Sequence, residues 1–222
     1  NSYYKHQILK DKNNYLNPMY GRRTFSDFYH TNYGVNDKQE HEEFEPQVID
    51  VNDLDKIKVF WNTGLANYSF LGEYLGKIYR KIPFKMFLKF PEKFTSPSNK
   101  RSVDLQCRIN TKYSKNSVAH QRVVIAKKLS NRLQTRKINR YSFFKELENS
   151  KIVLSPFGLG EITLKDFETF LSGAILMKPI MNHMKTWPNF YVQDNTYLSF
   201  NWDLTDIEEK IDTALRDYDK SI

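Results

Sequence analysis

The stretch that decides the fold runs from Lys151 to Pro179 and reads "KIVLSPFGLGEITLKDFETFLSGAILMKP". Its start, "KIVL", is short and apolar and predicts a buried strand. A turn that contains Gly158 and Gly160 follows, and then a helix with a charged start that Gly173 ends. The run "AILMKP" predicts a second buried strand. A strand, a glycine turn and a helix indicate an α/β unit, and such units bind their ligands at the carboxyl ends of the strands.

The segments around this unit continue the alternation of strands and helices. Residues 102–109, "SVDLQCRI", alternate in polarity and predict a strand, while 117–133 carry apolar residues at helical spacing. We expect a short helix that begins with Ser142 as N-cap, and a last helix in 203–218 whose capping box is Thr205 and Glu208. This alternation predicts an α/β fold, with a Rossmann-like parallel sheet that helices cover on both faces.

The first part of the chain has weaker patterns. Residues 1–46 are polar and predict little regular structure, 57–61 predict a short strand, and 70–90 predict a helix that Pro83 ends. Residues 91–100 hold two prolines among small polar residues and are the best linker candidate. We therefore expect a smaller, incomplete or irregular N-terminal part in residues 1–95 and a Rossmann-like domain in residues 96–222.

The net charge of +8 favours partners with negative charge, such as nucleic acid, anionic lipid or phosphorylated ligands. The charge is spread along the chain, and the aromatic residues do not repeat in the basic–aromatic pattern of a single-strand binder. We therefore expect no specific nucleic-acid partner. A basic nucleic-acid-binding protein stays open as an alternative, because its affinity comes largely from charge.

The single cysteine, Cys107, excludes an intramolecular disulfide and suits a reducing compartment. No apolar run approaches the ~20 residues of a membrane span, and no signal peptide is evident. We expect a cytoplasmic protein with peripheral membrane contact through the basic and apolar segment Tyr79–Phe90. The alternative for that segment is a helix packed on the core with its lysines in water.

The glycine turn and the helix after it predict an anion site. Helix N-termini carry partial positive charge and free N–H groups, and glycine lets the backbone approach a ligand. The alternative is an ordinary Glu161–Lys165 ion pair and a plain turn. On a helical wheel the side expected to face the crevice holds Glu161, Lys165, Glu168 and Ser172, and the side expected to face the sheet holds Phe167, Phe170, Leu171 and Ala174.

The segment Ser150–Pro179 resembles the donor-binding segment of GT-B glycosyltransferases, and it is most similar to exostosin-like and family-1-like members. Lys165 stands where many relatives have Arg, which keeps the charge but loses the bidentate fork. The upstream glutamate of retaining members would fall on Gly160, one residue before Glu161. The residues that occupy the family pattern are Ser150, Pro156, Gly158, Glu168, Gly173 and Pro179.

The resemblance implies a metal-independent glycosyltransferase that uses a nucleoside-diphosphate sugar as co-substrate, has no bound cofactor, and acts on a glycan or lipid-linked acceptor. It places the diphosphate over Gly158–Glu161 and the donor ribose on Glu168. A looser resemblance, of "DLQCRINTKY" and "SVAHQR" to the first strand and helix of the donor domain, adds three residues. The implied donor-binding residues are Gly158, Gly160, Glu161, Lys165, Asp166, Glu168, Arg108, Tyr113 and Arg122.

The catalytic base and any metal site are not indicated by the pattern. The five histidines form no H-E-x-x-H motif, and Cys107 has no partner for a zinc site, so no metal is expected. Candidate bases in the N-terminal part are Asp27, His30, Asp37 and His41. A complete GT-B enzyme needs two domains of similar size, so a non-catalytic nucleotide-binding module or a truncated donor domain stays open as an alternative.

Overall fold

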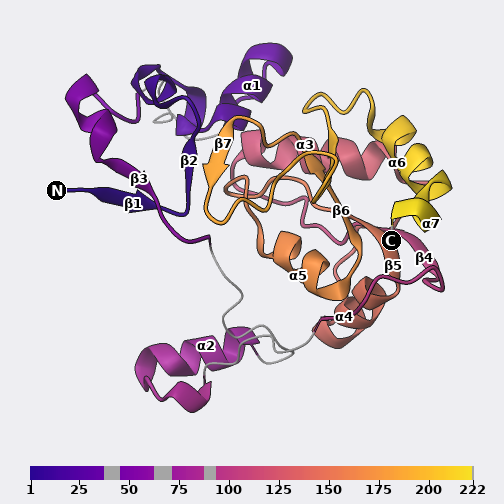
Figure 1. The fold of residues 1–222 in the computed structure, drawn as a ribbon. Helices are drawn as coiled ribbons and strands as arrows, with labels where there is room; N and C mark the ends of the chain where they lie inside the picture. The colour runs from indigo at the N-terminus through magenta and orange to yellow at the C-terminus, as the bar shows by residue number, and fades with distance from the viewer. Residues whose placement is uncertain (38–45, 63–71, 88–93, 222) are drawn as a thin grey trace.

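The computed structural model describes residues 1–37, 46–62, 72–87 and 94–221. Its centre is a four-stranded parallel sheet with the strand order β4-β5-β6-β8 (Figure 1). The strands are β4 (Val103–Gln106), β5 (Ser150–Leu154), β6 (Ile175–Pro179) and β8 (Leu198–Phe200). The predicted α/β class and parallel sheet are confirmed. β4 and β6 lie within segments predicted to be strands, and β5 extends the predicted run "KIVL" by Ser150.

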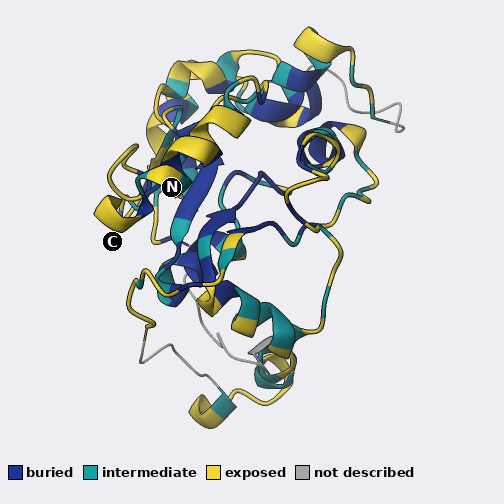
Figure 2. Cartoon of the chain, turned by 90° about the vertical axis from the view of Figure 1, so that its right-hand side faces the viewer, coloured by how far each residue is buried: buried dark blue, intermediate teal, exposed yellow. Residues whose placement is uncertain are grey.

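Helices cover both faces of the sheet. The side chains of a strand alternate between faces, and β5 shows this directly. Ile152 and Leu154 pack with α3 (Asn116–Lys128) and α6 (Ile207–Arg216), while Val153 packs with Leu147 of α4 (Arg140–Glu148). Figure 2 shows the central strands buried and the outer faces of the helices exposed. Burial on both faces explains the apolar runs Ile152–Leu154 in β5 and Ile175–Met177 in β6.

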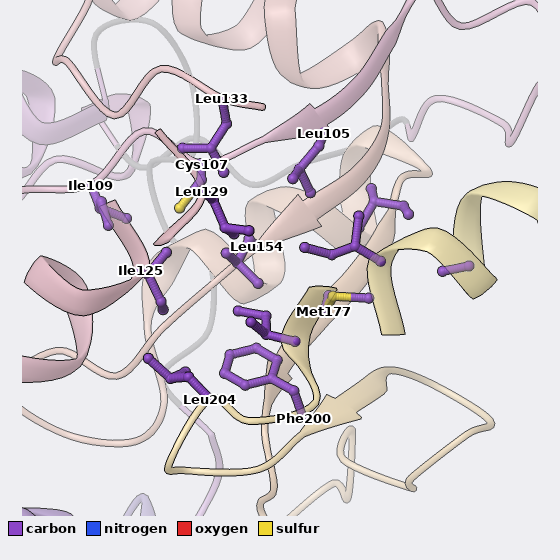
Figure 3. Close-up of a cluster of buried hydrophobic side chains, with 14 residues drawn as sticks. Leu105, Cys107, Ile109, Ile125, Leu129, Leu133, Leu154, Met177, Phe200 and Leu204 are labelled. Atoms are coloured by element: carbon purple, nitrogen blue, oxygen red, sulfur yellow. The ribbon is translucent and has the colours of Figure 1, made fainter. Parts of the chain in front are cut away.

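The larger core cluster joins all four strands to α3 and α6 (Figure 3). Several of its side chains have no exposed surface, and each buried side chain of this size contributes about 1.5–3 kcal/mol. Cys107 belongs to the cluster, and burial raises the pKa of its thiol to about 11. The thiol is therefore protonated at neutral pH and packs as a small apolar side chain. The side chains at the centre of the cluster are Leu154, Met177, Phe200, Leu129, Ile207 and Ile211.

Two helix starts differ from the predicted ones. α4 begins at Arg140, and its N-cap is Asn139, whose side chain accepts a hydrogen bond from the Ser142 backbone N–H at 2.9 Å. Ser142 therefore lies inside the helix. An asparagine is as good an N-cap as a serine, so the two starts could not be separated by residue type.

The predicted capping box of the last helix is also wrong. α6 begins at Ile207 after Asp206, one residue later than a Thr205 cap requires. The Thr205 hydroxyl instead donates to Asp203 Oδ1 at 2.8 Å. Local side-chain bonds of this kind compete with helix capping. The helix itself lies within the predicted range, and its Ile207 and Ile211 are both fully buried.

Residues 1–37 contain more regular structure than predicted. They form β1 (Tyr3–Lys5), β2 (Gln7–Leu9), two short 3₁₀ helices, and α1 (Thr24–Tyr33). On α1, Phe25 and Tyr29 are one turn apart, each 1% exposed, and pack in a cluster with Phe157 and Leu176 of the second half. Tertiary partners therefore stabilise a helix whose own sequence is mostly polar.

Strand pairs connect the N-terminal part to the rest of the chain. β1 pairs in parallel with β3 (Ile57–Val59), which lies within the predicted strand 57–61. β2 pairs antiparallel with β7 (Met184–Thr186), and the two lie side by side in Figure 1. The boundary between residues 95 and 96 stays a prediction. The described contacts show that the N-terminal elements share core with the second half.

The segment between the two parts holds α2 (Gly72–Lys81) and a short 3₁₀ helix (Lys85–Phe87). α2 ends before Pro83, as predicted. Phe84 and Met86 are exposed. The predicted membrane contact of Tyr79–Phe90 stays a prediction, and its last three residues lie outside the described ones. In the described part of the chain, no helix has the length and apolarity that a membrane span requires.

The predicted linker is held against the fold where it is described. The backbone N–H of Thr95 donates to the Leu171 carbonyl oxygen at 2.8 Å. The Tyr218 hydroxyl, in α7 (Tyr218–Ser221), donates to the Ser98 carbonyl oxygen at 3.0 Å. Residues 91–93 of this segment lie outside the described ones.

Gly173 ends α5 (Leu164–Ser172) in the left-handed conformation, as predicted, with φ 65°. A Cβ at this position would lie 2.2 Å from the Thr95 carbonyl oxygen, so the linker would have to move. Gly34 has a similar φ of 63°, and a Cβ there would meet no atom of the described residues within 4 Å.

Gly34→Ala should lower the free energy of unfolding by only the ~1–2 kcal/mol that a left-handed backbone costs. Gly173→Ala should lower it clearly more, because the added Cβ also meets the Thr95 carbonyl oxygen. Urea unfolding of both variants measures the difference, and equal losses would contradict the steric argument.

Candidate functional site

The predicted donor loop, residues 155–161, leaves the carboxyl end of β5. It is a tight turn, because the Gly158 backbone N–H donates to the Gly160 carbonyl oxygen at 3.0 Å. Gly158 is buried, and Leu159 at the tip is exposed. The predicted glycine turn at the carboxyl edge of the sheet is therefore confirmed. The Gly158 N–H is used inside the turn.

The helix after the turn begins later than the helical wheel assumed. α5 starts at Leu164, with Thr163 as N-cap and Asp166 in a capping box. Glu161 therefore precedes the helix, and the alternative of an ordinary Glu161–Lys165 helix pair is wrong. The sheet-facing side also differs from the prediction, since Asp166 and Thr169 have no exposed surface. Glu168 and Ser172, expected to face a crevice, are buried as well.

The polar stripe of α5 is buried because Asp166 has partners inside the fold. Its carboxylate accepts hydrogen bonds from Ser155 Oγ at 2.6 Å and from the Tyr191 hydroxyl at 2.7 Å. Lys178 Nζ, on β6, lies 3.1 Å from it, and neither Asp166 nor Lys178 is exposed. Burial lowers the pKa of Lys178, and Asp166 opposes that shift. Asp166, predicted as a donor ligand, therefore joins β5, β6 and α5.

Glu161 is held by residues far away in the sequence. The Gln7 amide donates to Glu161 Oε2 at 2.5 Å, and its carbonyl oxygen accepts from the Ile162 backbone N–H at 3.2 Å. His183 Nε2 lies 3.6 Å from Glu161 Oε1. Burial alone raises the pKa of Glu161, but His183 and Gln7 outweigh it and keep that pKa below its ordinary value. The carboxylate thus connects β2, the loop and the segment before β7.

Arg122, on α3, lies beneath the donor loop and is 9% exposed. Its Nε donates to the Phe157 carbonyl oxygen at 2.6 Å, and its guanidinium lies 5.1 Å from the centre of the Tyr113 ring. The structure thus brings Arg122 and Tyr113 to the loop, and their contact with the donor stays a prediction. A Cβ on Gly158 would lie 3.3 Å from Arg122 Nη2, so this glycine allows the close approach. Burial lowers the pKa of Arg122, but an arginine stays charged at neutral pH.

Lys165 lies in the first turn of α5 and is partly buried. Its Nζ donates to the Arg108 carbonyl oxygen at 2.6 Å, just beyond the carboxyl end of β4. Burial lowers the pKa of Lys165, and attraction to Glu168 opposes this more weakly. Neither Lys165 nor Arg122 forms an ion pair with a described carboxylate. A buried charge is costly unless it is paired, so two such cations at one sheet edge are typical of an anion site.

Arg108 is arranged differently from these two cations. Its guanidinium forms a fork on Glu146 of α4, with distances of 2.6 and 2.9 Å. The side chain is 15% exposed and its charge is neutralised in this pair. The predicted contact of Arg108 with a diphosphate would require this fork to open. In the structure the residue contributes its backbone carbonyl to Lys165.

A cleft opens beside the donor loop, toward the N-terminal part. One cavity of about 140 Å³ is lined by Gln7, Arg23, Gly160 and Glu161, among others. Arg23 Nε donates to the Leu159 carbonyl oxygen at 3.1 Å and so ties the loop to this part. A neighbouring cavity of about 560 Å³ shares four lining residues with the first. The shared residues are Lys5, Tyr15, Arg22 and Gln47.

The candidate bases of the N-terminal part have structural partners. Asp27 Oδ1 accepts from the Tyr20 backbone N–H at 3.0 Å, and His30 stacks on the Tyr20 ring. Asp37 accepts from the backbone N–H and the hydroxyl of Ser117, at the start of α3. His41 lies outside the described residues. Among the described residues, no group of three or more His, Cys, Asp or Glu side chains is arranged to hold a metal.

The donor loop is also held by Gln7, Arg23, Gln121 and His183, which were not predicted from the sequence. No local motif marks them, because each contacts the loop only through the tertiary fold.

Comparisons with protein-family models, with curated proteins and with solved structures find no match for this chain. The fold and the site define an α/β protein with a helix-covered parallel sheet. At the carboxyl edge of that sheet lie a buried arginine, Arg122, and a partly buried lysine, Lys165.

Proposed function

We propose that the chain is a GT-B glycosyltransferase, or the donor-domain half of one. It transfers a sugar from a nucleoside-diphosphate sugar to a glycan or lipid-linked acceptor. The observation that supports this most is the cation pair Arg122 and Lys165, whose hydrogen-bond partners among the described residues are all carbonyl oxygens. A diphosphate carries the charge that this pair lacks, and the carboxyl edge of a parallel sheet is where α/β proteins bind nucleotides.

The geometry supports a definite role for each cation. When the sugar leaves its donor, negative charge develops on the departing diphosphate, and cations fixed in advance stabilise it without reorganisation. Arg122 is fixed by the Phe157 carbonyl and the Tyr113 ring, and Lys165 by the Arg108 carbonyl.

Glu168 and the cleft complete the proposed site. Glu168 follows Lys165 by three residues on α5, so the two side chains lie on one side of the helix. This placement agrees with the ribose contact that the GT-B resemblance implies. The cleft that reaches Gly160 from the N-terminal part is the proposed place of the acceptor. Glu161 then positions the loop through Gln7 and His183.

Calorimetric titration with UDP, GDP, ADP and dTDP at moderate salt tests the proposal. We expect one diphosphate to bind saturably and Lys165→Ala and Glu168→Ala each to weaken it about tenfold or more, since bonds to charged groups contribute about 1.5–3 kcal/mol. Lys127→Ala, an exposed lysine of α3, is the matched control and should bind as the wild type does. If none of the four binds, or if both site variants bind unchanged, the donor site is wrong.

A titration with a single-stranded oligonucleotide distinguishes a nucleic-acid-binding protein from the proposed glycosyltransferase. That alternative requires affinity that falls steeply with salt and that survives Glu168→Ala. Such a result, together with no diphosphate binding, would replace the glycosyltransferase proposal.

A further inference from the structure

Residues 74–87, in α2 and the short 3₁₀ helix after it, form what we call the α2 surface. None of these residues belongs to a buried apolar cluster of the described part of the chain. In Figure 1 the two helices lie away from the central sheet and from the helices that cover it. Exposed apolar side chains that gather in one place mark an interaction site, whereas single ones need no explanation. Those of the α2 surface are Tyr74, 65% exposed, Ile82, 48%, Phe84, 61%, and Met86, 74%.

The helix places these side chains together. Tyr74, Ile78 and Ile82 follow one another at a spacing of four residues, so they form one apolar stripe along α2. The helical bonding reaches Ile82, whose backbone N–H donates to the Ile78 carbonyl oxygen at 2.8 Å. The Phe84 backbone N–H then donates to the Ile82 carbonyl oxygen at 2.8 Å. Phe84 therefore stays next to the end of the stripe.

The charges of the α2 surface all have one sign. Residues 74–87 contain four basic residues and no acidic one. All four are exposed, and none forms an ion pair with a described carboxylate. Lys77 lies three residues after Tyr74, and Lys81 three residues after Ile78, so both lysines border the apolar stripe. The four basic residues are Lys77, Arg80, Lys81 and Lys85.

An apolar stripe bordered by cations is complementary to a surface that is negative outside and apolar beneath. A bilayer with anionic headgroups has both properties: apolar side chains enter the boundary of the acyl chains, and Lys and Arg attract the headgroups. Lysine suits this position, because its stem lies along apolar surface while its ammonium group stays in water. The alternative of a helix packed on the core does not account for the exposure of Phe84 and Met86.

We propose that the α2 surface binds the face of a membrane that carries anionic phospholipids. α2 lies in the plane of the headgroups, with its apolar stripe and Phe84 and Met86 toward the acyl chains and its basic residues among the phosphates. This contact does not depend on the cation pair Arg122 and Lys165 or on the reaction proposed there.

Sedimentation of the full chain with sucrose-loaded vesicles tests the proposal. We expect vesicles that contain phosphatidylglycerol to bind the protein about tenfold or more tightly than vesicles of phosphatidylcholine alone, since each basic residue near an anionic surface adds to the attraction. High salt should weaken the binding, because it screens exposed charges. No binding to the phosphatidylglycerol vesicles, or equal binding to both kinds, would overturn the proposal.

A first pair of variants tests the apolar side chains. Phe84→Ser combined with Met86→Ser should weaken binding to the phosphatidylglycerol vesicles by about tenfold or more, because two apolar side chains no longer leave water. Ile49→Ser combined with Val51→Ser is the matched control. It changes two apolar residues at the same spacing, 94% and 58% exposed, and should bind as the wild type does. Unchanged binding by the first double variant, with its circular dichroism spectrum also unchanged, would contradict the proposal.

A second pair of variants tests the charges. Lys77→Glu combined with Lys81→Glu should weaken vesicle binding by about tenfold or more. Lys127→Glu combined with Lys210→Glu makes the same change in net charge at exposed lysines of α3 and α6, which lie away from α2 in Figure 1. Charges farther than a Debye length from the membrane are screened, so we expect this control to change the affinity less than about threefold. Equal losses for the two double variants would show that net charge alone attracts the protein to the vesicles, and the α2 surface would then be no specific membrane site.

Discussion

Replacement of Asp166 by alanine should lower the free energy of unfolding by about 3–5 kcal/mol, the usual effect of removing one partner of a buried ion pair. Lys178 would stay fully buried with no carboxylate within reach, since Asp166 is its ion-pair partner in the described residues. Ser155 and Tyr191 would each lose the acceptor of a buried hydrogen bond. Urea unfolding followed by circular dichroism measures this loss.

Two further variants make the prediction for Asp166 specific. Lys151 and Asp104 also form an ion pair, at 2.6 Å, but the Asp104 side chain is 63% exposed. Asp104→Ala should therefore cost less than about 1 kcal/mol. Asp166→Leu combined with Lys178→Met should recover much of the lost stability, because no buried charge remains. A loss for Asp166→Ala no larger than that for Asp104→Ala would show that the buried network contributes little.

The sheet could be predicted from the sequence because its signals are local. Runs such as "IVL" in β5 and "AILM" at β6 are apolar at every position, and a strand buried on both faces needs such a run. Gly173 was equally clear, since a left-handed helix end strongly favours glycine. The helix α1 gave no such signal. Phe25 and Tyr29 are stabilised by residues more than 100 positions away, and no local pattern records those contacts.

The site was predicted less well, and one missed signal explains part of this. Thr163 and Asp166 have the spacing of a capping box, which would have moved the helix start past Glu161. The helical wheel then would not have grouped Glu161 with Lys165. The different pairing of the basic residues had no signal in the sequence. Arg108 and Arg122 are both basic residues near β4, and only the fold shows that Glu146 neutralises the first and not the second.

The buried and partly buried cations of this protein differ in their partners. Lys178 is fully buried and paired with Asp166, which is what stability requires. Arg122 and Lys165 are bonded to carbonyl oxygens, and neither forms an ion pair with a described carboxylate. Arg101 is 5% exposed and is likewise bonded to carbonyl oxygens, so this kind of bonding alone does not mark an anion site. What sets Arg122 and Lys165 apart is their place at the carboxyl edge of the sheet, where α/β proteins bind anionic ligands. The donor diphosphate of the proposed reaction is such a ligand.

Arg122 should therefore dominate the affinity for the diphosphate. Arg122→Met is expected to weaken binding of the diphosphate by about 10–100-fold, the range for bonds to charged groups. The monophosphate of the same nucleoside carries less charge, so its affinity should fall less. Arg122→Lys keeps the charge without the planar fork, and we expect an intermediate effect. Calorimetry with both nucleotides measures the change in preference.

This test must distinguish a loss of stability from a loss of ligand contact, because Arg122 also holds the loop through the Phe157 carbonyl. Thermal unfolding shows how far each variant is destabilised, and only variants folded at the titration temperature are compared. Arg216→Met, at an exposed arginine of α6, controls for the general loss of positive charge. If Arg122→Met weakens the monophosphate and the diphosphate equally while staying folded, Arg122 shapes the loop and does not contact the second phosphate. If Arg216→Met has the same effect as Arg122→Met, the binding reflects net charge, and the cation pair is no specific diphosphate site.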